Sequence, residues 1–155
     1  DISHVSDAAF MKVLELSKAP VVATHSSLRH FTPGWERNVS DEMLIALAEN
    51  GGVIQLCFGS DFVANRKDNP DIEVSVKNVV DHIDRVRDLV GIDHVGFGSD
   101  FDGEVPLPED INDVSKFPNL IEELLIRGYT ESEIDKILNE NILRVWKEVR
   151  ALADV

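Results

Sequence analysis

Residues 72–103 read IEVSVKNVVDHIDRVRDLVGIDHVGFGSDFDG, and this stretch carries the strongest fold signal in the chain. Its first part places apolar residues three or four positions apart from Ile72 to Val90, which predicts a helix with one apolar face. Its second part predicts a short buried strand, Val95–Phe97, followed by an aspartate-containing loop. A helix that packs on a sheet and leads into such a strand is typical of a parallel βαβ unit.

The same alternation of strand and helix runs through the rest of the chain. Further strands are predicted at Val21–Ala23 and Val53–Phe58, and the first residues of the chain look like the end of a fourth strand. Helix start and stop signals lie at Ser40-Asp41-Glu42, Gly51-Gly52, Gly128 and Thr130–Glu133. The last helix, from Asn141 to about Ala153, is expected to bury Ile142, Val145, Trp146 and Val149.

Four parallel strands are half of what a closed barrel requires. A (β/α)₈ barrel has eight strands and about 250 residues, whereas this chain has 155 residues. We therefore interpret residues 1–155 as the second half of a TIM-like (β/α)₈ barrel of the α/β class, with additional C-terminal helices and with the upstream half absent. A small open α/β sheet is the structural alternative, and an isolated half barrel would leave two strand edges unpaired.

Composition excludes several classes of function. Fifteen basic against 29 acidic residues give a net charge of −14, which argues against nucleic acid or an anionic membrane surface as a partner. The single cysteine, Cys57, excludes an intrachain disulfide and a cysteine-based zinc cluster, and its apolar surroundings predict a core position. The chain opens on Asp1 rather than Met, so its cellular location is left unassigned.

Three residues suited to metal chemistry follow the predicted strands: His4, His25 and Asp100. The carboxyl ends of parallel strands meet at one edge of a sheet, about 4.8 Å apart. Two imidazoles from neighbouring strands can therefore meet one Zn²⁺ at about 2.0–2.1 Å. A carboxylate from a further strand can then act as general base on the water that the metal polarises. Two histidines alone do not make a tight zinc site, so other ligands must come from elsewhere.

The loop after Val95–Phe97 has two competing interpretations. Asp100–Glu104 resembles a calcium loop, but Gly103 comes too early for the EF-hand pattern. Gly96 and Gly98 are compatible with the phosphate site that many barrels build near strand eight, but an acidic loop would repel phosphate. The metal-hydrolase interpretation is favoured over both, because three residues at equivalent strand ends mean more than one histidine alone.

These residues resemble the membrane (renal) dipeptidases, a family of zinc metallopeptidases with a TIM-like barrel. The resemblance spans essentially the whole chain, and its most specific parts are the 21-residue step from His4 to His25 and the segment 97–103. The matching segments are DISHVS (1–6), APVV (19–22), THSS (24–27), RNV (37–39), DHID (81–84), GFGSDFDG (96–103), DVSKFP (113–118) and NILRVW (141–146).

The resemblance implies a role for each candidate residue. His4 and His25 look like the two histidines of one zinc in a binuclear centre. Asp100 looks like the acidic residue that takes a proton from the attacking water and delivers it to the leaving amine. Arg37 looks like the arginine that holds the free carboxylate of the dipeptide, a task suited to a planar bidentate donor. Phe62 falls near the position where some relatives use a tyrosine to contact substrate.

The remaining histidines receive no role in the chemistry. His82 is interpreted as an ordinary helix residue, and His94 as the start of a strand far from the site. The family's first-strand His-x-Asp pair, its metal-bridging glutamate and a histidine that stabilises the reaction intermediate belong upstream of this segment and are absent from it.

The sequence therefore predicts a zinc dipeptidase that acts as part of a complete barrel. Its expected partners are a dipeptide substrate and the upstream half, and a homodimer is compatible with it. The alternatives are another binuclear amidohydrolase, acting on a lactone or a cyclic amide, and a non-catalytic fragment that serves as a binding or regulatory module.

Overall fold

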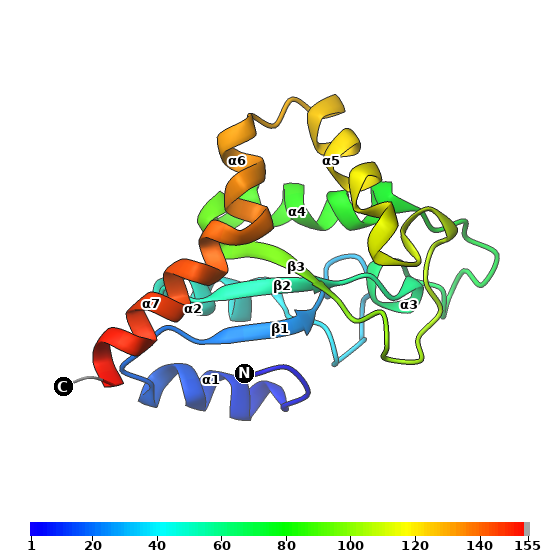
Figure 1. Ribbon diagram of the computed structural model, residues 1–155. Helices are drawn as coiled ribbons and strands as arrows, with labels where there is room; N and C mark the ends of the chain where they lie inside the picture. Colours follow the sequence, from blue (N-terminus) through cyan, green and yellow to red (C-terminus); the bar gives the residue numbers. More distant parts are fainter. Residues whose placement is uncertain (154–155) are drawn as a thin grey trace.

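Three parallel strands form the sheet at the centre of the computed structural model, which describes residues 1–153 (Figure 1). Their order is β1 (Val22–Ser26), β2 (Val53–Cys57) and β3 (Val95–Ser99), so neighbours in sequence are neighbours in space. All three run in the same direction, and their carboxyl ends meet at one edge of the sheet. The central strand is almost entirely buried, as expected for a parallel strand covered on both faces.

Helices connect the strands and extend the fold beyond them. α1 and α2 pack together, and α2 packs on α4. The helices are α1 (Asp7–Leu16), α2 (Asp41–Glu49), α3 (Ser60–Val63), α4 (Val76–Val90), α5 (Phe117–Ile126), α6 (Glu131–Asp135) and α7 (Asn141–Ala153), with a π-helical turn at Lys136–Glu140 and single 3₁₀ turns at Ile92–His94, Glu109–Ile111 and Val114–Lys116. Within residues 1–153, no helix combines the length and apolar character that crossing a bilayer requires.

Helix α4 confirms the apolar stripe but begins later than predicted, at Val76 rather than Ile72. The backbone N–H of Ser75 donates to Asn78 Oδ1 at 3.0 Å, which forms part of a capping box at the helix start. The Asp110 carboxylate accepts the N–H of Val76 at 3.0 Å. This N–H is in the first turn of the helix and so has no carbonyl partner within it. These caps fix the helix start, which apolar spacing alone does not.

The start of α7 seals the amino edge of the sheet. Asn141 is buried and donates through Nδ2 to the carbonyls of Ile92 and Val95, both at 2.8 Å. Val145 is buried, as predicted, and Ile142 is half-buried, but the expected burial of the other two residues is wrong: Trp146 is 64% and Val149 41% exposed. The described residues provide too little to cover them, and both line an open apolar groove beside the amino end of β1.

The expected end of a fourth strand is not formed within the described residues. Ile2 does make one ladder-like bond, from its N–H to the carbonyl of Val22 at 2.9 Å. The next β1 donor, the N–H of Thr24, bonds at 3.0 Å to the side chain of Asp1 instead of to a backbone carbonyl. The chain then turns at Ser3 and His4. The structure shows an α/β fold with a three-stranded parallel sheet.

Candidate active site

Two irregularities lie where β1 and β3 approach the carboxyl edge. Thr24 and His25 together oppose Gln55, so β1 carries an extra residue there. In β3, Gly98 is the extra residue between two paired positions. Such bulges bend a strand and redirect its side chains. His25 consequently lies inside β1, whereas the sequence predicts it after the strand.

The two bulges touch each other, and Gly98 makes this contact possible. A Cβ on Gly98 would lie 2.2 Å from the carbonyl oxygen of Thr24 and 2.9 Å from that of Gln55. A side chain is therefore excluded at this position, because two backbone segments would have to separate. The bulges bring the end of β3, and with it Asp100, toward the end of β1.

His4 and His25 converge on one point. Their Nε2 atoms are 2.8 Å apart, and their ring centroids are separated by 4.9 Å. Thr24 contacts the ring nitrogen of His25 that faces away from His4. Its Oγ1 donates to Asp1 Oδ2 at 2.8 Å and lies 2.7 Å from His25 Nδ1. Because the threonine proton is directed to Asp1, His25 Nδ1 donates to Thr24 Oγ1. The lone pair of His25 is then on Nε2, directed toward His4.

This arrangement fits a metal ion that prefers nitrogen ligands. Two tetrahedral zinc ligands at about 2.0–2.1 Å hold their nitrogens roughly 3.3 Å apart. The two Nε2 atoms would have to separate only slightly from their observed 2.8 Å to bind one zinc. Within residues 1–153, however, no group of three or more histidine, cysteine or acidic side chains is placed to hold a metal. The chain thus offers two ligands and leaves the rest of a centre to other residues.

Arg37 contacts both histidines from the loop after β1. Its Nη2 donates to the carbonyl of His25 at 2.6 Å and to His4 Nε2 at 3.1 Å, while Nη1 donates to Ser26 Oγ at 2.7 Å. Burial lowers the pKa of Arg37, which still remains a cation. Its guanidinium lies over the ring of Phe62, 5.5 Å from the centroid.

Asp100 follows β3 directly and stands in a strained backbone. Its φ is 67°, and that of Ser99 is 42°; His4, at 63°, is in the same left-handed region. Non-glycine residues rarely adopt this conformation, and such strain concentrates at functional sites. Gly103 leaves room for the Asp100 carboxylate, since a Cβ on Gly103 would lie 2.6 Å from Oδ1.

The neighbours of Asp100 are a thiol and charged groups. Cys57 Sγ lies 3.8 Å from Asp100 Oδ2, and burial raises the pKa of Cys57 to about 11, so it stays a neutral thiol. The pKa of His4 is lowered, first by burial and then by Arg37 and His25, while Asp100 acts in the opposite direction. Asp100 is therefore close enough for its charge to act on His4, although no hydrogen bond joins them.

The structure thus brings His4, His25 and Arg37 into direct contact and places Asp100 beside them at the same edge. The sequence missed two residues that hold this edge together, Asn38 and His82, both 0% exposed. Asn38 had a usable signal, since it follows Arg37 directly in the segment 37–39. His82 lies in the matching segment 81–84, but its spacing predicts only an ordinary helix residue, since its partners, in the loop after β1 and in α3, are distant in sequence.

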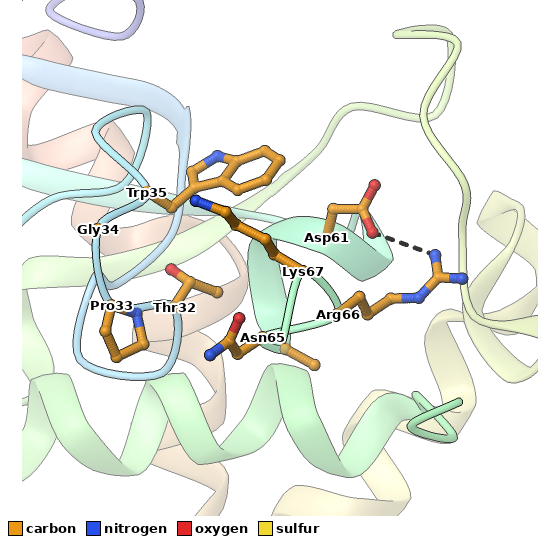
Figure 2. A pocket seen from close by; sticks show the side chains of 9 residues that line it. Thr32, Pro33, Gly34, Trp35, Asp61, Asn65, Arg66 and Lys67 are labelled. Carbon is orange, nitrogen blue, oxygen red and sulfur yellow. Dashed lines mark hydrogen bonds and ion pairs between the residues drawn. The ribbon is translucent and has the colours of Figure 1, made fainter. Parts of the chain in front are cut away.

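A separate pocket of about 270 Å³ lies outside this cluster (Figure 2). Residues 32–35 form one wall, and Asp61 with residues 64–67 form the other. Trp35, from the first wall, packs edge-on against Phe62 with centroids 5.9 Å apart, so these rings stand between the pocket and Arg37. None of the predicted site residues lines it.

Two histidines that converge on one point, with an arginine and a strained aspartate at the carboxyl edge of a parallel sheet, are the arrangement expected of a metal-dependent hydrolase. The family model of the membrane dipeptidases (Peptidase family M19) matches residues 1–155, and the chain belongs to this family.

Relatives and solved structures agree with this assignment. The chain is 45% identical over 153 residues to the dipeptidase ataJ of Aspergillus terreus, covering 99% of this chain and 36% of that protein. A metallopeptidase from Rhodobacter sphaeroides, solved with a phosphinate mimic of the dipeptide L-Ala-D-Ala, matches with a TM-score of 0.86 and 36% identity, covering 96% of this chain and 41% of that one. The probable dipeptidase PvdM from Pseudomonas aeruginosa matches with a TM-score of 0.88 and 28% identity, covering 97% of this chain and 50% of that one. The chain thus spans half or less of the length of these three proteins.

Proposed function

We propose that this chain is the C-terminal half of a binuclear zinc dipeptidase, which hydrolyses the peptide bond of dipeptides. The observation that carries the proposal is the convergence of His4 Nε2 and His25 Nε2 at 2.8 Å, with Arg37 bonded to both residues. The dipeptidase name of the Aspergillus relative and the dipeptide mimic in the Rhodobacter structure support the substrate class.

In this proposal each residue has one task. His4 and His25 would hold one zinc through Nε2, and residues of the upstream half would hold the second. Bound zinc supplies a Lewis acid that polarises water and the substrate carbonyl. Arg37 holds the free carboxylate of the dipeptide by charge-assisted hydrogen bonds. Asp100 takes the proton of the attacking water and delivers it to the leaving amine.

The half-barrel part of the proposal is supported by the lengths of the relatives and by an uncovered surface. The chain accounts for 36% of the Aspergillus dipeptidase and 41% of the Rhodobacter enzyme. A three-stranded sheet has two open edges, which proteins normally pair or cover. The upstream half of the barrel would supply the partners of both edges, β1 on one side and β3 on the other.

The apolar groove beside β1 is the proposed seat of one upstream strand. It has a volume of about 590 Å³, and its lining includes Val21, Val22, Val145 and Trp146. Asp1 also borders this groove, and Ile2 already pairs with Val22. A parallel strand leading into Asp1 would therefore run along the outer edge of β1 and cover Trp146. This explains why the apolar face of α7 is exposed in residues 1–153.

Substrate profiling of the complete barrel tests the proposal. We expect turnover of L,L- or L,D-dipeptides that is lost on chelation and regained with added zinc, and little turnover of a lactone or a cyclic amide. One neighbouring structure, from Pseudomonas aeruginosa, is called an amidohydrolase, at 29% identity and a TM-score of 0.83. Turnover of the lactone or cyclic amide without dipeptide turnover would overturn the proposal in favour of that chemistry. A complete barrel with no hydrolytic activity would favour a non-catalytic product.

A further inference from the structure

Asn38 joins the segment after β1 to α3. Its Oδ1 accepts the backbone N–H of Ser27 at 3.2 Å, and its Nδ2 donates to the carbonyl of Phe62 at 2.8 Å. Nδ2 also donates to Thr32 Oγ1 at 2.7 Å. Asn38 is fully buried, so the side chain has no competing water, and its amide is used at both ends.

His82 makes the same connection one residue further along both segments. Its Nδ1 accepts the N–H of Leu28 at 3.0 Å, and its Nε2 donates to the carbonyl of Val63 at 3.2 Å. The two backbone partners define a neutral ring with the proton on Nε2. Burial lowers the pKa of His82 to about 3, so this form persists at physiological pH. Phe31 packs on the ring with centroids 4.4 Å apart.

Two side chains from distant parts of the chain therefore bridge consecutive backbone groups, residues 27–28 on one side and residues 62–63 on the other. Each accepts from an N–H of the first segment and donates to a carbonyl of the second. We call these four hydrogen bonds the double bridge. It fixes the loop after β1 against α3 in two places, which resists both separation and rotation of the two segments.

Arg37 lies on this fixed loop, next to Asn38. The loop is closed on itself by backbone bonds of Val39, whose N–H donates to Ser27 and whose carbonyl accepts from Arg29, both at 2.8 Å. The guanidinium of Arg37 also lies over Phe62, a residue of the double bridge. The place of Arg37 relative to the two histidines thus depends on how the loop and α3 are joined.

Beyond the double bridge the loop after β1 and the segment from α3 onward diverge. They form the two walls of the pocket of about 270 Å³, in which Thr32 and Trp35 face Asn65 and Lys67 (Figure 2). Packing between the two segments is interrupted at the pocket. The hydrogen bonds of Asn38 and His82 are therefore important for holding the loop against α3.

We propose that His82, together with Asn38, is a positioning residue for Arg37 and thereby sets the affinity of the enzyme for the carboxylate of its substrate. The inference rests on the proposed role of Arg37 in dipeptide binding. His82 itself touches neither histidine of the site, and it acts only through the double bridge. Loss of its hydrogen bonds leaves the N–H of Leu28 buried without an acceptor and frees one end of the loop.

The test is a double-mutant cycle in the complete barrel, with His82→Leu and Arg37→Met. We expect His82→Leu to raise KM for a dipeptide about tenfold, with kcat changed less than about threefold and zinc content retained. In the Arg37→Met background, His82→Leu should change KM no further. His82→Gln, which offers one acceptor and one donor as Asn38 does, should recover part of the loss. His94→Leu, at the opposite edge of the sheet, is the matched control and should leave KM unchanged.

An equal rise of KM in both backgrounds, or a fall of kcat at constant KM, would overturn the inference. Amide hydrogen exchange supplies a second measurement that needs no turnover. Exchange of the Leu28 N–H should be at least about tenfold faster in His82→Leu, or in His82→Gln if the first variant does not fold, while exchange in β2 is unchanged. Unchanged protection of Leu28 contradicts the double bridge. Absence of dipeptidase activity in the unsubstituted barrel contradicts the proposed function and leaves the exchange result to decide on the bridge.

Discussion

Asp100→Asn should lower kcat for dipeptide hydrolysis by about 10²–10⁴-fold, the range typical of a lost general acid–base group. The amide has nearly the same shape as the carboxylate, so the pocket left by Gly103 still accommodates it. It cannot take a proton from water at neutral pH. Steady-state kinetics of the complete barrel, with metal content measured on the same samples, tests this, and we expect zinc content and KM to stay close to those of the unsubstituted enzyme.

Asp102→Asn is the matched control for this substitution. Asp102 lies two residues away in the same loop and is exposed, so removing its charge should leave kcat nearly unchanged. A kcat for Asp100→Asn within a few-fold of the unsubstituted enzyme would mean that another group carries the proton.

Arg37→Met should raise KM for a dipeptide by about 10- to 100-fold, since hydrogen bonds to a charged group contribute about 1.5–3 kcal/mol. Methionine keeps apolar contact with Phe62 but removes every donor that faces the site. The effect should be much smaller with a dipeptide amide, which has no carboxylate to hold. Comparing kcat and KM for the two substrates separates lost carboxylate binding from general damage.

Arg66→Met serves as the control for Arg37. Arg66 forms an ion pair with Asp61 at 3.1 Å on the wall of the neighbouring pocket and touches none of the site residues (Figure 2). Its substitution should leave KM unchanged for both substrates. Equal losses with the dipeptide and its amide in Arg37→Met would remove Arg37 from carboxylate recognition.

Local pattern was sufficient for the strands and most helices of the described fold. Apolar spacing located α4, and the capping signals at Ser40 and Thr130 coincide with helix starts, because both effects act over one or two turns. The face of α7 shows the limit of such patterns. Periodicity identifies which residues are apolar, whereas burial of Trp146 depends on what lies against it, and residues 1–153 leave 64% of it exposed.

The sequence indicates candidate residues for the site but not their geometry. Strand-end position and family resemblance pointed to His4, His25, Arg37 and Asp100. The bulges that redirect two of them depend on a contact between Gly98 and Thr24, 74 residues apart in sequence. The double bridge likewise depends on His82 reaching the loop after β1 and α3 at once. Contacts of this kind form only when the chain has folded, so no single segment carries their signal.

Metal analysis of the complete barrel tests whether His4 and His25 share one zinc ion. We expect about two zinc ions per barrel, as in other two-metal hydrolases, falling to about one in His4→Ala and in His25→Ala with loss of turnover. His94→Ala, which alters a histidine at the opposite edge, should retain both zinc ions. Undiminished zinc content and turnover in His25→Ala would show that the two histidines do not share a zinc ion.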